Sequence, residues 1–163
     1  MQKGFATIEI VFATMIIAVL ITLTIPNVSR VLDRAALDYE TKRLYSELRY
    51  LQAISRAATL SPIGIGTDAL KQSNPPYMQL SKSMRSYQLM NGNDKSLRER
   101  HYMRNVTKMD YTGNIPSERI FFDGAGKANI TSNTIKLYPN FGKPSGIVFT
   151  SVGRFRGESI INE

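Results

Sequence analysis

Residues 5–25 read FATIEIVFATMIIAVLITLTI, and the only charged side chain among them is Glu9. At about 1.5 Å per residue, a helix of these 21 residues spans roughly 30 Å, the thickness of a bilayer's hydrocarbon core. A cleavable secretory signal is the alternative, but it has an apolar core of roughly 7–15 residues and a small-x-small exit. Residues 20–27 read LITLTIPN, with no small-x-small pair. The stretch therefore predicts a membrane helix that the mature protein retains.

The overall composition excludes several classes of protein. The chain has 163 residues, about one domain, with no cysteine and one histidine, His101. Disulfide scaffolds, thiol catalysis and the common cysteine and histidine metal sites are thereby excluded. No pair of acidic residues is placed for acid/base work, so we predict a non-enzyme with no catalytic residue, metal or cofactor. A net charge of +8 favours acidic partners such as nucleic acid or anionic lipid.

Glu9 is the first residue that indicates a function. A carboxylate inside an apolar membrane helix costs on the order of 3 kcal/mol on insertion scales, so it normally has a partner. Lys3 is the only other charged residue before Arg30, so the neighbouring residues of the same chain supply almost no partner for Glu9. We expect the partner of Glu9 to come from another subunit. The alternative is that Glu9 lies at headgroup depth and is solvated.

The amino terminus resembles that of a known family. Residues 1–10 read MQKGFATIEI and are followed by the apolar run and Pro26. This pattern is similar to the prepilin signature of type IV pilins and type II secretion pseudopilins. The resemblance implies that a prepilin peptidase removes residues 1–4 by cutting after Gly4, and that Phe5 becomes N-methylated. It also implies that Glu9 acts in assembly and that Pro26 bends the helix.

The charges that flank the span do not decide its orientation, because Lys3 on one side faces Arg30 and Arg34 on the other. The resemblance implies a cytoplasmic leader and an extracytoplasmic carboxyl-terminal head, on a single-pass protein of the inner membrane. Its implied partners are other pilin or pseudopilin subunits, the prepilin peptidase and the inner-membrane assembly platform.

Beyond Pro26 the apolar residues recur at spacings of three and four, which is typical of an amphipathic helix. They are Val28, Val31, Leu32, Ala35, Tyr39, Leu44, Leu48, Leu51, Ile54 and Ala58. We predict one helix from Phe5 to about Thr59, with residues 5–26 in the membrane and 27–60 as its amphipathic continuation. The stripe from Leu44 to Ala58 needs a globular partner.

Residues 61–163 are predicted to supply that partner as a β-rich head. Turn signals such as Asn91-Gly92 and Asp123-Gly124 separate short, partly alternating apolar runs. We predict strands at 77–80, 86–90, 102–107, 119–122, 134–138 and 147–152. The fold class is therefore α+β, a long amino-terminal helix packed against an antiparallel β domain.

The carboxyl-terminal third narrows the resemblance. It contains IFFDGAG at 120–126, TIKL at 134–137, IVF at 147–149 and GRFR at 153–156. This order is similar to the GspH/FimT branch of minor pilins, and competence pseudopilins of the D type share a similar ending. Residues 61–117 resemble no family.

Two groups of basic residues are candidate nucleic-acid contacts. One group is Arg98, Arg100 and Arg104, and the other is Arg154 and Arg156. The alternative for both groups is a solvated basic surface. The resemblance implies that a terminal GR-x-R segment, here residues 153–156, binds DNA during uptake, mostly through phosphates.

Two functions follow from these patterns. The first is a structural minor subunit that is assembled into, or initiates, a type IV pilus or a type II secretion pseudopilus. The alternative is a FimT-like DNA-binding minor pilin for natural transformation, or a competence pseudopilin. A third possibility is an unprocessed single-span membrane protein with an extracytoplasmic β domain.

Overall fold

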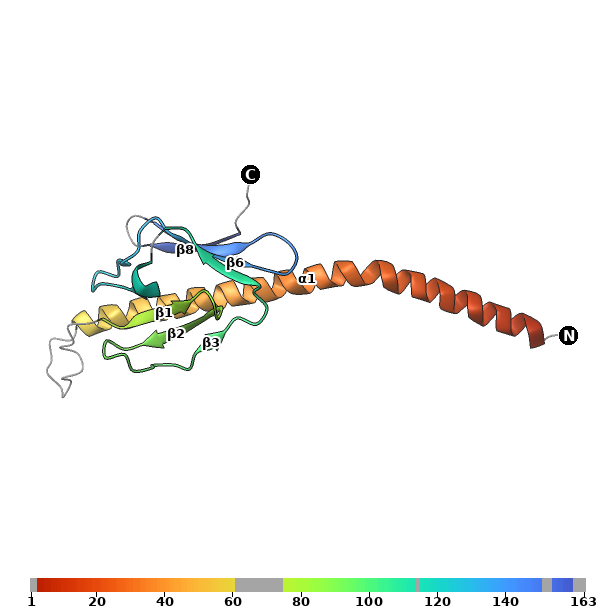
Figure 1. Cartoon of the computed structure of the whole chain (residues 1–163), viewed down its shortest axis with the longest axis horizontal. Coiled ribbons are helices and arrows are strands. Elements are labelled where there is room, and N and C mark those ends of the chain that lie inside the picture. Colours follow the sequence, from red (N-terminus) through yellow and green to blue (C-terminus); the bar gives the residue numbers. More distant parts are fainter. Residues whose placement is uncertain (1–2, 61–74, 114, 151–153, 160–163) are drawn as a thin grey trace.

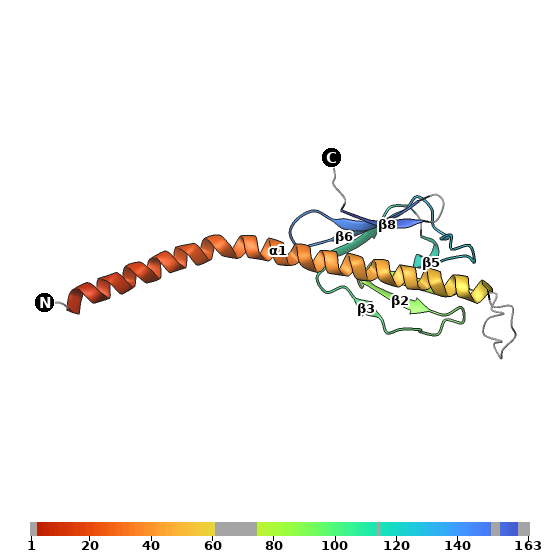
Figure 2. The same ribbon diagram turned by 180° about the vertical axis from the view of Figure 1, so that it is seen from behind.

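One long helix organises the molecule. The computed structural model describes residues 3–60, 75–113, 115–150 and 154–159. Helix α1 runs from Lys3 to Leu60, close to the limits that the sequence predicts, and about half of it projects away from the head (Figure 1). The helix is continuous through Pro26, which has no N–H to bond the carbonyl of Thr22. Its ribbon curves over the projecting half (Figure 2), as expected where one backbone hydrogen bond is missing.

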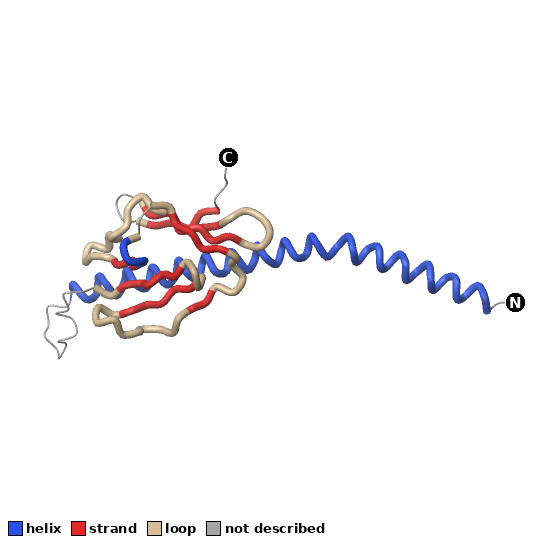
Figure 3. Tube along the Cα trace, in the orientation of Figure 1, coloured by secondary structure: helices blue, strands red, loops and turns tan. Residues whose placement is uncertain are grey.

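The strands form two four-stranded antiparallel sheets that cover only the carboxyl-terminal half of α1 (Figure 3). The first sheet has the order β3-β2-β1-β5 and the second β4-β6-β7-β8. The first comprises β1 (Tyr77–Ser81), β2 (Ser86–Met90), β3 (His101–Tyr102) and β5 (Arg119–Phe121). The second comprises β4 (Lys108–Tyr111), β6 (Thr134–Tyr138), β7 (Ser145–Phe149) and β8 (Phe155–Ser159). A short 3₁₀ helix, Pro116–Glu118, precedes β5. The predicted α+β fold, a helix packed on an antiparallel domain, is confirmed.

Most predicted strands coincide with observed ones, but the strand predicted at 102–107 is wrong. β3 ends at Tyr102, and a loop follows until β4 begins at Lys108. The loop buries Met103 and Val106 in the core, which explains the apolar signal without a ladder. The hydroxyl of Thr107 bonds the carbonyls of Tyr138 and Pro139, fixing the loop to the end of β6. Of the strand predicted at 147–152, residues 151 and 152 lie outside the described part.

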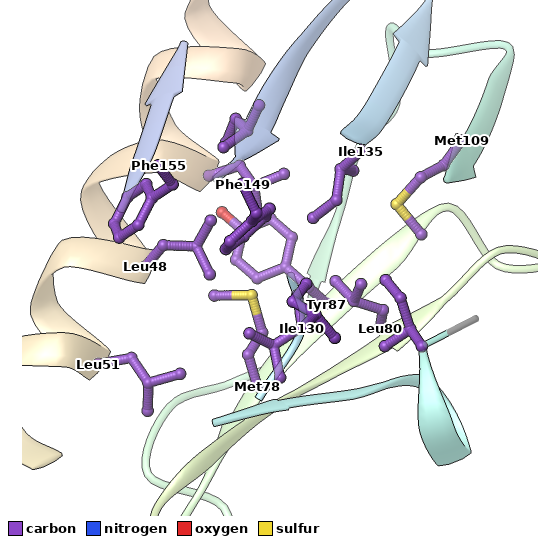
Figure 4. Close-up of a cluster of buried hydrophobic side chains, with 14 of the residues drawn as sticks. Leu48, Leu51, Met78, Leu80, Tyr87, Met109, Ile130, Ile135, Phe149 and Phe155 are labelled. Carbon is purple, nitrogen blue, oxygen red and sulfur yellow. The ribbon is translucent and has the colours of Figure 1, made fainter. Parts of the chain in front are cut away.

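The core forms between one stripe of α1 and both sheets. Leu37, Leu44, Leu48 and Leu51 follow one another at spacings of seven, four and three, and all are buried. They pack in a cluster with Met78 and Leu80 of one sheet and with Ile135 and Phe149 of the other (Figure 4). The side chain of Ala58, the last predicted member of the stripe, lies outside the described part. Packing begins only at Leu37, since Val28, Val31 and Leu32 are exposed.

An ion pair and a hydrogen bond attach residues 98–101 to the helix. Arg98 Nη1 lies 2.7 Å from Glu47 Oε1, and His101 Nε2 lies 2.7 Å from Glu40 Oε2. His101 is half-buried against the ring of Tyr87, and the Glu40 carboxylate beneath it is buried. The pair compensates the desolvation of that carboxylate.

Candidate functional site: an exposed apolar helix and a basic groove

The projecting half of α1 is apolar on all sides and uncovered. Its large apolar side chains are between 48% and 66% exposed. They are Ile8, Ile10, Val11, Phe12, Met15, Ile16, Ile17, Val19, Leu20, Ile21, Ile25, Val28, Val31 and Leu32. By length and composition this helix can cross a membrane. An apolar surface of this extent marks a membrane or protein contact.

Three hydroxyl groups in this half are bonded within the helix itself. Thr14 Oγ1 donates to the carbonyl of Val11 at 2.9 Å, and Thr22 Oγ1 donates to that of Val19 at 2.8 Å. Ser29 Oγ donates to the carbonyl of Ile25 at 3.1 Å. Polar groups that are satisfied within the helix are tolerated in hydrocarbon.

Glu9 is the exception in this surface. It is exposed, and within the described part of the chain it makes no ion pair. Gly4 and Phe5 lie in the first turns of α1 and Pro26 lies in its interior, so one continuous helix carries all four predicted residues. The side chains of Phe5 and Pro26 lie outside the described part.

A second feature is a basic groove beside the far end of α1, with a volume of about 720 Å³. Helix α1, the turn after β5 and the segment around the start of β8 line it. Its side chains include five cations, namely Arg49, Arg56, Lys127, Arg154 and Arg156. None of the described residues that line the groove is acidic. This concentration of one charge attracts polyanions, because the positive potentials add over a shared surface.

Contacts between the three elements hold the groove together. Gln52 Nε2 donates to the carbonyl of Gly126 at 2.7 Å, which ties the helix to the turn at residues 123–127. Gly126 has a φ of +80°, and a Cβ there would lie 2.2 Å from Nε of Arg56, so the turn needs glycine. The guanidinium of Arg49 lies 4.6 Å from the centre of the Phe155 ring, which it covers.

Phe155 sets the positions of the arginines on either side of it. Its buried ring packs on Phe122 and Phe149, with centroids 5.7 Å and 5.6 Å away. Alternation along an extended segment then turns Arg154 and Arg156 outward, and both are exposed. Both predicted arginines therefore line the groove.

The other predicted basic residues lie elsewhere. Arg98, three residues before β3, pairs with Glu47, and its guanidinium lies 4.5 Å from the centre of the Tyr50 ring. Arg100 donates to Oε1 of Gln88 at 3.2 Å and 3.3 Å. Arg104 is exposed in the loop after β3. The structure thus separates these residues from Arg154 and Arg156.

Sequence reasoning missed three members of the groove, Arg49, Arg56 and Lys127. A signal was present in the helix, because Arg49, Gln52 and Arg56 are spaced by three and four and share one face. Nothing local connects that face with residues 153–156, which lie about a hundred residues later. In the described part of the chain, no three acidic or histidine side chains gather as a metal site.

Comparisons with known proteins support the fold. No protein-family model matches the sequence, and no curated protein matches it. Among solved structures, the chain is similar to the minor pseudopilin EpsH from the type 2 secretion system of Vibrio cholerae. The match has a TM-score of 0.56 and 10% sequence identity, and it covers 76% of this chain and 96% of that one. The chain therefore has the fold of a minor pseudopilin, a long amino-terminal helix on an antiparallel β head.

Proposed function

We propose that the chain is a minor structural subunit of a type IV pilus or a type II secretion pseudopilus. The observation that carries the proposal is the half-covered helix, a continuous apolar rod on a folded head. The pseudopilin fold and the residues around Gly4 and Glu9 support it further. In this proposal residues 5–26 anchor the subunit in the inner membrane, and the head lies outside the cytoplasm. The role is structural and not enzymatic.

Glu9 gives the assembly step its specificity in this proposal. Cleavage after Gly4 creates a new amino group on Phe5, which lies one helical turn before Glu9. A carboxylate and an amine that are both held in apolar surroundings attract each other strongly, because water no longer screens them. The amine of one subunit pairs with Glu9 of a neighbour and thereby sets the axial register of the filament.

Processing is tested on protein isolated from its native host with the assembly platform and peptidase present. The intact mass should correspond to loss of residues 1–4 and addition of one methyl group to Phe5. A mature filament subunit that still carries Met1 contradicts the assignment to prepilin-like proteins.

The role of Glu9 is tested by Glu9→Gln, with Glu9→Asp as the variant that keeps the charge. Glu9→Gln should insert into the membrane at least as well as the parent chain, because a buried charge is removed. It should be lost from sheared filaments, whereas Glu9→Asp retains part of the incorporation. Thr14→Val is the matched control, since its hydroxyl bonds only its own helix. Normal incorporation of Glu9→Gln rules out the pairing.

The basic groove favours a second role, binding of DNA in a competence filament. Arg154 and Arg156 belong to the GR-x-R segment, and Arg49, Arg56 and Lys127 extend their charge over one surface. Such a groove binds phosphates without reading bases. DNA-binding and filament assembly are compatible, because the groove and the projecting helix lie at opposite ends of α1.

This second role is tested by titrating a short duplex with the full chain in an uncharged detergent at two salt concentrations. Replacing Arg154 and Arg156 with alanine should weaken binding to any sequence. The log–log salt slope should become shallower by about two, following roughly 0.9 per phosphate contact. Arg98→Ala with Arg104→Ala removes the same charge outside the groove and is the matched control. Equal losses from both pairs indicate a diffuse positive field instead of a site.

A further inference from the structure

The end of the head that faces the projecting half of α1 forms a surface of its own. We call it the basal face and define it by residues 82–85, 103–108 and 139–144. Its place follows from two contacts with the helix, because Arg98 lies beside Glu47 and His101 lies beside Glu40. From 98 to 101 the chain therefore moves two helical turns toward the amino terminus of α1, and residues 103–108 continue that way.

Hydrogen bonds join the three segments of the basal face. The N–H of Met103 donates to the carbonyl of Arg85 at 2.9 Å, and Arg85 Nη1 donates to the carbonyl of Val106 at 3.0 Å. The N–H of Thr107 donates to the carbonyl of Tyr138 at 2.8 Å, and its hydroxyl donates to the carbonyl of Pro139, the first residue of the third segment, at 3.0 Å. Figure 2 shows the loop after β6 lying over α1 close to where the helix leaves the head. The three segments therefore form one surface at the helix exit.

The three segments of the basal face have a net positive charge. Its three segments contain five basic residues and no acidic one, namely Lys82, Arg85, Arg104, Lys108 and Lys143. Lys82 and Lys108 are partly neutralised, since they lie 3.0 Å and 3.1 Å from the carboxylate of Asp110. The Arg85 guanidinium donates to an uncharged group, the carbonyl of Val106. Arg104 and Lys143 are exposed, and Arg30 and Arg34 of the adjoining helix are exposed as well.

The basal face also has an exposed aromatic side chain, Phe141, two residues before Lys143. Phe141 is 58% exposed at the tip of the loop between β6 and β7. Gly142, next to it, has a φ of +109°, and nothing lies within 4 Å of the position that a Cβ would occupy. The space beside Gly142 is therefore open, and more than half of the Phe141 side chain is exposed next to it. Segments that bind the surface of a bilayer combine Lys and Arg with apolar side chains such as Phe, which enter the boundary between headgroups and acyl chains.

The distances allow this loop to reach a membrane that contains the projecting helix. From Ile25, the end of the apolar run, to Leu37, the first buried helix residue, α1 rises about 18 Å. The headgroup layer takes up roughly 5–8 Å of that height. A loop of six residues can project about 10 Å, which closes most of the remaining gap. The usual helix tilt of about 20° brings one side of the head still closer.

We propose that the basal face binds the anionic phospholipid headgroups of the bilayer that holds α1. Phe141 enters the interface, and Arg104 and Lys143 face the phosphates, with Arg30 and Arg34 beside them. This inference rests on the proposed membrane anchoring of the subunit. Opposite charge favours this occupant, and α1 holds the bilayer at the required height. Bound this way, the head lies against the membrane until the subunit is drawn into a filament.

The absence of tryptophan from the chain makes a direct test possible. Phe141→Trp places a single reporter at the tip of the basal face in the full-length protein. Phe121→Trp is the matched control, because Phe121 is exposed and pairs with Tyr77 at the opposite end of the head. Each variant is reconstituted into vesicles of phosphatidylcholine alone and of phosphatidylcholine with phosphatidylglycerol. Brominated lipids serve as quenchers, and flotation reports membrane insertion.

The expected result is specific to position, lipid and charge. Emission from the reporter at 141 should shift to shorter wavelength and be quenched in anionic vesicles, and the reporter at 121 should not change. About 1 M salt, which shortens the Debye length to roughly 3 Å, should abolish the difference, as should Arg104→Glu with Lys143→Glu. If the protein floats with both kinds of vesicle but the emission of Trp at 141 is the same in neutral and anionic vesicles, lipid binding by the basal face is ruled out and the membrane anchoring is not. A chain that floats with neither overturns the membrane anchoring, and this inference falls with it.

Discussion

The large apolar side chains described in the amino-terminal half of α1 are at least 48% exposed, whereas Leu44, Leu48 and Leu51 in the carboxyl-terminal half are completely buried. The two halves differ in the distribution of apolar residues around the helix. In the first half they occupy every side, which suits a surrounding apolar solvent. In the second they form one stripe, and charged residues such as Lys42 and Asp38 occupy the rest. A single helix can therefore serve two environments when its periodicity changes along its length.

The largest effect should follow from separating the halves. Removal of residues 1–30 takes away the exposed apolar side chains up to Val28 and keeps every buried leucine of α1. We expect residues 31–163 to be a soluble monomer by light scattering, with a near-ultraviolet circular dichroism spectrum typical of fixed packing. The full chain should need detergent. Aggregation of the fragment, or a flat near-ultraviolet spectrum, shows that the head depends on the first half.

A smaller effect should come from one leucine in each half. Leu48→Ala leaves a cavity between α1 and both sheets and should lower the free energy of unfolding by about 2–5 kcal/mol. Leu32→Ala is the same substitution at a position that is 63% exposed. It should change the free energy of unfolding by less than about 0.5 kcal/mol. Urea unfolding of the full chain in uncharged detergent measures both. Similar values for the two variants contradict the division of α1.

The smallest effect concerns an ion pair at the basal face. Hydrogen bonds from Lys82, then Lys108, then the backbone N–H of Tyr111 lower the pKa of Asp110 from 3.8 to about 2. Because the folded pKa is the lower one, the contribution is complete above pH ~4 and is lost as the pH falls through ~2. The carboxylate is 35% exposed, so solvent screening limits the contribution to below about 1 kcal/mol.

Asp110→Asn isolates this contribution. The difference in unfolding free energy between parent and variant should shrink between pH 5 and pH 2, as followed by urea titration of residues 31–163. A difference that stays constant over that interval shows that Asp110 acts through packing and not through its charge.

The sequence predicts best what depends on local periodicity. The limits of α1 and the position of β6 follow from patterns in neighbouring residues, and the structure places both close to the prediction. The loop at 103–107 was mistaken for a strand, because buried Met103 and Val106 imitate strand hydrophobicity without alternating in a ladder. β8 was not predicted as a strand, since Phe155 is its only large apolar residue.

The candidate sites also differ in whether local sequence reveals them. Glu9 stands out because its charge conflicts with its neighbours, and that conflict is visible in the sequence. The basic groove is not visible there, because Arg49, Lys127 and Arg154 meet only after the strands have been placed around the helix. The contact of Glu40 with His101 joins residues 61 positions apart, and neither has a local pattern that indicates it.

The continuity of α1 has a mechanical consequence. With 58 residues in one helix, the two halves are joined by a stiff rod of about 87 Å and not by a flexible linker. From Ile25 to Leu60 the rod forms a lever arm of roughly 50 Å, so a change of about 10° in its angle to the bilayer displaces its far end by roughly 9 Å. The groove beside Arg56 lies near that end. Small changes in the angle of the apolar half are thus amplified into large displacements of the groove, including any change that accompanies the proposed insertion into a filament.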